Sequence, residues 1–196
     1  LLILDSMICG MFQFRESIEK HEIFDLTKTL YPFFAEEYFL PWHFEEIETQ
    51  IDKSIKKLVD NNLLIIKENE VKRPNVNSEE FIECQALGRI AQRSIDRFYI
   101  LMLQLWRNEE SHISINELEK KCRKISKNLE ARHSWLMPEF SEKWTFDLFI
   151  NHLIEAKFVK KDENGFVYPL KITKRIEDDF KTFITVSYTH LRAHET

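Results

Sequence analysis

Apolar side chains recur with helical spacing through most of the chain, and the longest such segment runs from Ser78 to Asn108. It contains no proline, and Ser78 followed by Glu79 and Glu80 is typical of a helix N-terminus. We therefore predict a central helix, nearly all apolar toward its end and covered there by other elements. Its expected buried stripe comprises Ile82, Ala86, Ile90, Ile95, Phe98, Met102, Leu105 and Trp106.

Shorter helical patterns lie on both sides of this segment. Residues 19–40 predict a helix or two, interrupted at Pro32, with Glu36 and Glu37 turned outward. Residues 1–12 read as a core helix already under way, which we interpret as a truncated start. The other predicted helices cover 44–60, 113–132 (with a capping box from Ser114 to Glu117), 143–156 and, weakly, 178–184.

Two short hairpins complete the pattern. Residues 63–66 and 71–73 predict strands around a charged turn, and strands beginning at 158 and 166 flank the turn Asp162-Glu163-Asn164-Gly165. We therefore predict a mainly α fold with small β-hairpins (α+β), in which two winged-helix-like helix-plus-hairpin units flank the long central helix. This domain spans 1–185, and 186–196 reads as a non-native or disordered tail.

Composition narrows the chemistry. Sixteen phenylalanines against three glycines favour helices, and the widely separated glycines cannot form a phosphate-binding loop. Cys9, Cys84 and Cys122 lack metal-ligand spacing, so we predict buried free thiols, no metal and no cofactor. A net charge of −5 gives no global attraction to nucleic acid.

Three arginines form the candidate binding feature. Arg89, Arg93 and Arg97 are four residues apart and therefore line one face of the predicted helix. They can hold an anion such as a lipid headgroup, a phosphate of coenzyme A or another domain's carboxylates. The alternative is a solvent-exposed helix face on which Asp96 and neighbouring acidic residues neutralise the arginine charges.

The helix-plus-hairpin pattern also suggests a DNA-associated or protein-interaction scaffold module. Acids interleave with the bases throughout, and the would-be recognition helix carries Glu45, Glu46 and Glu48, which disfavours DNA reading. The basic candidates are Lys53, Lys56, Lys57 and Arg73 in the first unit, and Lys157, Lys160, Lys161, Lys171, Lys174 and Arg175 in the second.

A catalytic constellation is missing. An acyltransferase signature of the form His-x4-Asp pairs a base with an acid that orients it, yet no histidine here is followed five residues later by aspartate. Those positions hold Leu26, Glu48, Glu117, Pro138, Lys157 and Glu195. No G-x-S-x-G elbow is present either.

Several segments nevertheless resemble one family, in the same order along residues 25–185. Leu30–Trp42 resembles a Y-P-x-x-x-x-E-L-F-L-x-W segment of the bacterial membrane-associated glycerol-3-phosphate acyltransferases. Arg93–Trp106 is similar to that family's R-x-x-x-R-[YF] helix. Ile113–Glu119 and the segment Pro138-Glu139-Phe140-x-x-Lys143 are similar to further family segments, the latter to P-E-F-x-D-K.

The resemblance implies a parent enzyme that transfers a fatty acyl group from acyl-CoA or acyl-carrier protein to glycerol-3-phosphate at the inner face of the cytoplasmic membrane. It also implies that the His-x4-Asp domain lies upstream, so no catalytic residue is carried over and this portion alone should be inactive. Its expected role is scaffold, membrane contact or assembly, without nucleic acid. The aromatics considered for membrane contact are Phe39, Trp42 and Trp135, whose alternative is the core.

Overall fold

The computed structural model describes residues 2–13, 15–108, 113–132 and 143–170. The expected helix at 178–184 and the tail at 186–196 lie outside this part of the chain. The described residues are mostly helical with small antiparallel sheets, which confirms the predicted fold class. They divide into two compact units, the first comprising residues 2–35 and 40–92 and the second residues 36–39 and 93–170.

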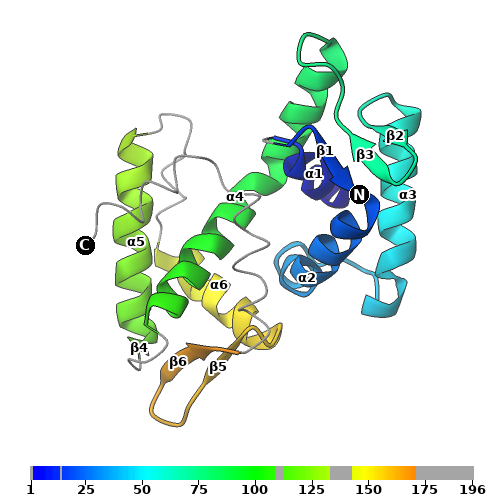
Figure 1. Ribbon diagram of the computed structural model, residues 1–196. Coiled ribbons are helices and arrows are strands. Elements are labelled where there is room, and N and C mark those ends of the chain that lie inside the picture. The colour runs from blue at the N-terminus through cyan, green and yellow to red at the C-terminus, as the bar shows by residue number, and fades with distance from the viewer. Residues whose placement is uncertain (1, 14, 109–112, 133–142, 171–196) are drawn as a thin grey trace. The chain divides into compact units, whose positions relative to one another are not determined.

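The first unit consists of α1 (Leu2–Met11), β1 (Ser17–Glu19), α2 (Lys20–Tyr38), the short 3-10 helix η1 (Phe44–Glu46), α3 (Ile47–Asp60), β2 (Ile65–Lys67) and β3 (Glu70–Lys72) (Figure 1). Its sheet has the order β1-β3-β2, because β1 pairs with β3 on the side opposite the hairpin partner. The hairpin was predicted, whereas the three-residue strand β1 was not. Its core includes Met7, Ile8, Phe12, Ile23, Phe33, Phe34, Ile51, Ile55 and Val71.

The second unit repeats this order. It contains α4 (Glu79–Arg107, shared with the first unit), β4 (Ile113–Ser114), α5 (Ile115–Arg132), α6 (Lys143–Glu155), β5 (Val159–Lys161) and β6 (Phe166–Pro169) (Figure 1). The sheet order is β4-β6-β5, which matches β1-β3-β2 strand for strand. Its core includes Phe98, Met102, Leu118, Phe146, Phe149, Ile150 and Val167, with Phe98 packed edge-to-face on Phe158.

The match between the two units extends to single residues. Ile18 and Ile113 occupy the same register in the two sheets, each opposite a buried valine of the return strand. Leu58 and Leu153 are both buried in the last turns of α3 and α6. Each counterpart pair is separated by 95 residues (113 − 18 and 153 − 58). The two units are therefore an internal structural repeat with winged-helix-like topology.

Both third helices also end in the same way. The N–H of Leu63 donates to the C=O of Leu58, and the N–H of Phe158 donates to the C=O of Leu153. The intervening Asn62 and Lys157 have φ of 58° and 60°, so each helix closes through a left-handed residue in a Schellman motif. After this closure the chain continues into the buried residue that precedes each hairpin, Leu64 in the first unit and Phe158 in the second.

The predicted capping signals are confirmed. Ser78 Oγ accepts the N–H of Phe81 at 3.2 Å, which begins α4. Ser114 and Glu117 form the reciprocal box, since each side chain accepts the other's backbone N–H at 3.3 Å. Gly165, with φ of 84°, lies in the turn in which Asp162 Oδ1 accepts the N–H groups of Asn164 and Phe166.

Two expectations about helices are wrong. α2 continues through Pro32 as one helix, because its neighbours Leu30, Tyr31, Phe33 and Phe34 are buried and hold the backbone despite the lost hydrogen bond. In α4, Ile82, Ala86 and Ile90 are exposed rather than buried. The first half of that helix instead packs on α1 through the opposite face, which carries Cys84, Gly88 and Ala91.

Candidate functional site

Arg97 is the predicted binding residue that lies in a polar cluster of the second unit. The guanidinium of Arg97 lies over the ring of Phe149, 5.2 Å from its centroid, and Phe149 also contacts the His152 ring. Arg97 stabilises the charged form of Glu37, at the end of α2. We call Glu37, Tyr38, Ser94, Arg97 and Phe149 the Glu37 cluster.

A chain of hydroxyl groups ends on the Glu37 carboxylate. Ser94 Oγ donates to Glu37 Oε1 at 2.7 Å and lies 2.6 Å from the hydroxyl of Tyr38. Because Ser94 has one proton, which it gives to Glu37, the Tyr38 hydroxyl must donate to Ser94. Burial raises the pKa of Glu37 to about 7, although Ser94 and Arg97 both oppose this shift. The cluster can therefore take up and release a proton near neutral pH.

The sequence prediction had turned Glu37 outward, and this is wrong. Only its neighbour Glu36 is exposed, whereas Glu37 is partly buried. The signal that could have found it is helical spacing, because Glu37 and Tyr38 lie four residues after the buried Phe33 and Phe34. Asp96, expected among the acids of a solvated face, is also buried.

Two of the three arginines have described side chains, and these two differ in environment. Arg89 is exposed and Arg97 is half-buried against Phe149, while the side chain of Arg93 lies outside what the structure describes. The predicted anion site therefore stays a prediction. Of the two whose side chains are described, Arg89 is the exposed one.

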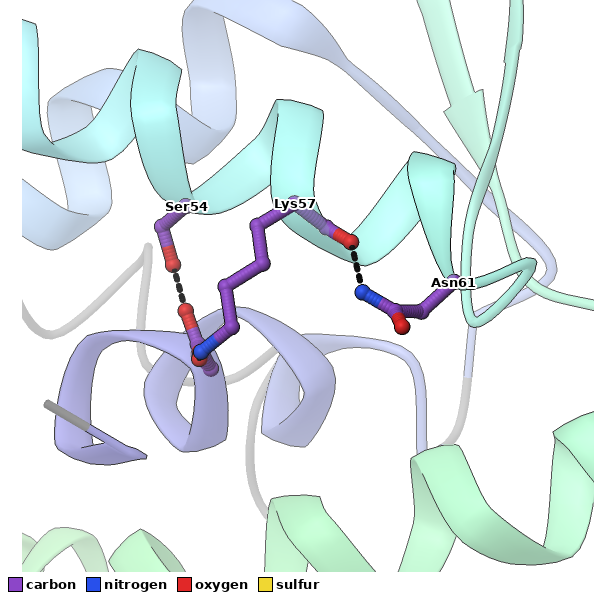
Figure 2. Close-up of polar contacts among 4 residues, drawn as sticks. Ser54, Lys57 and Asn61 are labelled. Carbon is purple, nitrogen blue, oxygen red and sulfur yellow. Dashed lines mark hydrogen bonds and ion pairs between the residues drawn. The ribbon is translucent and has the colours of Figure 1, made fainter.

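A second polar cluster joins α1 to α3 in the first unit. Asp5 is buried in α1, and its carboxylate accepts a hydrogen bond from Ser54 Oγ. The same carboxylate forms an ion pair with Lys57 Nζ at 2.5 Å. Figure 2 shows Ser54 and Lys57 extending from α3 on the same side, and Asn61 donating to the backbone C=O of Lys57 at 2.7 Å. This arrangement satisfies a buried carboxylate and so serves packing.

The cysteines are free and buried, as predicted. Cys9 and Cys84 face each other between α1 and α4, and the hydrogen bond to Cys84, together with burial, raises the pKa of the Cys9 thiol far above its ordinary value. Cys122 is buried in the second unit, where burial also raises its pKa. Among the described residues no group of three His, Cys, Asp or Glu side chains is placed to hold a metal ion.

The histidines that the structure describes have local structural contacts. His21 Nδ1 lies 3.0 Å from Glu19 Oε2, and His43 precedes η1 with its N–H donating to Glu46 at 3.0 Å. His43 is thus the N-cap residue of η1. His152 is buried beside Phe149. These contacts account for each of the three without a substrate.

Phe39 is the exposed aromatic among the candidates for membrane contact that can be placed. It follows the last residue of α2 with φ of 51°, and 88% of its surface is exposed. Trp42 is half-buried, and its backbone C=O accepts the Tyr31 hydroxyl at 2.5 Å, whereas Trp135 lies outside the described residues. None of the helices in the described part of the chain has both the length and the apolar character needed to cross a bilayer.

Taken together, the fold and its polar clusters define a duplicated helical module with small sheets. The family described as the glycerol-3-phosphate acyltransferase C-terminal region matches residues 1–162. The chain belongs to this family, which confirms the resemblance.

Among full-length relatives, the chain is 28% identical over 165 residues to the glycerol-3-phosphate acyltransferase of Pseudomonas fluorescens strain SBW25. It is also 28% identical over 165 residues to that of Ectopseudomonas mendocina strain ymp. Each alignment covers 84% of this chain and 20% of the relative, so the chain spans about a fifth of the length of these curated relatives. No solved structure matches it.

Proposed function

We propose that this chain is the C-terminal, non-catalytic portion of a glycerol-3-phosphate 1-O-acyltransferase. The parent enzyme would transfer an acyl group from acyl-CoA or acyl-carrier protein to sn-glycerol-3-phosphate, in phospholipid synthesis. The observation that carries the proposal is the family match over residues 1–162, combined with relatives of which the aligned segment makes up only 20%. The DNA-associated and scaffold alternatives gain no support from these relatives.

The chemistry of the residues supports an inactive portion. Deprotonation of a glycerol hydroxyl requires a positioned base, and in the family pattern this is a histidine oriented by an aspartate five residues later. No histidine of this chain has that partner, and His21, His43 and His152 have the local contacts described above. The base and the phosphate-binding groups would therefore come from the polypeptide outside residues 1–196.

We place the parent enzyme at the cytoplasmic face of the inner membrane as a peripheral protein. The exposed ring of Phe39 supports contact with a lipid surface by this portion, since an exposed aromatic ring inserts readily at the headgroup level. The exposed Arg89 can hold an anionic group, which is a lipid headgroup, a phosphate of coenzyme A or a carboxylate of another domain.

The test is acyl transfer by two purified proteins, the full-length protein encoded by the gene and the 196-residue chain. With labelled glycerol-3-phosphate and acyl-CoA, the full-length protein should form lysophosphatidic acid, and the chain alone should form none at equal concentration. The control is full-length protein in which the upstream His-x4-Asp histidine is replaced by alanine. Product from the chain alone, or none from a folded full-length protein, would contradict the proposal.

A further inference from the structure

In the part of the first unit that the structure describes, the first half of α4 presents an exposed apolar face. Ile82 is 65% exposed and Ile90 is 50% exposed, and Ala86 between them is also exposed. These residues are four apart, so they form one continuous stripe along the helix. We call Ile82, Ala86 and Ile90 the Ile82 face.

The helix cannot rotate to bury this face, because its opposite side is fixed to α1. Ser6 Oγ donates to the C=O of Leu87 and accepts the N–H of Ala91, both at 2.7 Å. A Cβ added at Gly88 would lie 2.9 Å from the backbone N of Gly10, so the two backbones are in direct contact. Rotation of α4 therefore cannot bury the Ile82 face among the described residues of the first unit.

Size and charge restrict what can cover this face. Three side chains bury far less than the roughly 800 Å² per partner that a stable dimer requires, which disfavours a second copy. The exposed acids Glu79 and Glu83 lie on the same half of the helix and outnumber the exposed Arg89 there, so the charge around the face does not favour an anionic lipid surface. A segment of the same polypeptide can use a small face, because covalent connection removes most of the entropic cost of association.

We propose that the Ile82 face docks the part of the parent polypeptide that lies outside residues 1–196. The proposal rests on the proposed function, under which about four-fifths of the enzyme is elsewhere, as the 20% coverage of the relatives implies. The complementary surface would be apolar at its centre, with Lys or Arg opposite Glu79 and Glu83 and a carboxylate opposite Arg89. The C-terminal portion then contributes to the enzyme by binding the catalytic portion through α4.

Thiol labelling tests this directly. The three native cysteines of this chain are buried, so they should react slowly with a maleimide. Ile82→Cys or Ile90→Cys therefore introduces the accessible thiol of the chain. Leu148→Cys on α6, at a position that is 43% exposed, is the matched control. Each variant is treated with a maleimide, both as the 196-residue chain and as the detergent-solubilised full-length protein, and modification is read at the named residue by peptide mass spectrometry.

We expect labelling at positions 82 and 90 to be about tenfold slower or more in the full-length protein, since a covered thiol reacts only through transient opening. Labelling at 148 should be equal in both proteins. Equal rates at 82 and 90 would overturn the proposal, as would protection of the chain alone by phosphatidylethanolamine–phosphatidylglycerol vesicles or by raised protein concentration. Acyl transfer by the unmodified full-length protein is measured in parallel, so a failed function is distinguished from a failed docking face.

Discussion

Glu37 is a carboxylate that the folded chain keeps partly protonated at neutral pH. Burial raises its pKa from 4.5 to about 7, and the hydrogen bond from Ser94 and the charge of Arg97 compensate for only part of the desolvation. The same last turn of α2 leads to Phe39, an exposed aromatic residue with positive φ. A buried carboxylate and an exposed aromatic residue with positive φ are both unfavourable, so the end of α2 contains two destabilising features.

The first prediction concerns the pH dependence that Glu37 causes. In the unfolded chain its pKa is near 4.5, so between that value and about 7 the folded state binds more protons. Stability should therefore fall as pH rises through this window, by on the order of 3 kcal/mol. Glu37→Gln should remove this dependence and be more stable than the wild type at slightly alkaline pH. Urea unfolding across the window measures it, with the exposed Glu36→Gln as control, and an unchanged slope in Glu37→Gln would contradict the assignment.

The second prediction concerns Phe39. A bulky residue with φ of 51° is sterically disfavoured, and the ring gains little from burial because 88% of it is exposed. Phe39→Gly should stabilise the chain by about 0.5–1 kcal/mol, as glycine suits a residue after a helix C-terminus. Phe39→Ala keeps the unfavourable φ and should not stabilise. Chemical denaturation of both variants checks this, and a loss of stability in Phe39→Gly would show that the ring makes a favourable contact.

At the scale of elements, the crossing of α1 and α4 depends on small side chains and on a serine hydroxyl that takes the place of one backbone hydrogen bond of α4. Ser6 Oγ bridges the C=O of Leu87 and the N–H of Ala91, two groups that pair with each other in a regular helix. The insertion of a side chain into this ladder is a known cause of local helix distortion. Gly88 permits the approach that brings Ser6 within reach.

The third prediction follows from the space at Gly88. Helix propensity alone favours alanine by about 1 kcal/mol. We nevertheless expect Gly88→Ala to destabilise the chain by about 1–3 kcal/mol, because the new Cβ would meet the backbone of Gly10 at 2.9 Å. Ala86→Gly on the exposed face is the control and should cost only the propensity difference. Thermal and urea unfolding measure both, and a stabilised Gly88→Ala would refute the close packing.

Element-level prediction from sequence succeeds where the signal is local. The apolar period of α3 and the turn at Asp162 each identify their elements, and the Ser114–Glu117 box marks a helix start. Strands β1 and β4 were missed because they have three and two residues and are defined by pairing with distant partners. The prediction that Ile82 and Ile90 are buried was wrong because α4 crosses α1 closely. Such a crossing places the small residues Gly88 and Ala91 in the contact and leaves the two isoleucines exposed.

At the scale of the whole molecule, the chain contains two copies of one topology whose polar interiors have diverged. Ser54 and Lys57 of the first unit pair with the buried Asp5, whereas Phe149 and His152 occupy the corresponding positions of α6 in the second. The repeat positions could be predicted as two helix-plus-hairpin patterns. The Glu37 cluster could not, since it joins residues from three helices that no local pattern connects.

The fourth prediction tests the DNA alternative for the intact chain. A net charge of −5 repels phosphate, and α3 alternates acids with bases, as in the pairs of Asp52 with Lys20 and Lys56. We expect no binding to a labelled DNA duplex at physiological salt and no steep salt dependence at lower salt. Fluorescence anisotropy measures this. Tight binding that weakens steeply with added salt would instead support a DNA-associated module.

The pairing of each sheet has a consequence for the order in which the chain acquires its structure. The hairpins β2–β3 and β5–β6 join neighbouring segments, whereas β1 and β4 reach across more than half a repeat to meet β3 and β6. Closing such distant ends carries a chain-entropy cost that local contacts avoid. Each sheet should therefore nucleate at its hairpin and gain its outer strand last, once the two intervening helices have condensed. During synthesis the first repeat can complete this sequence before the second has left the ribosome.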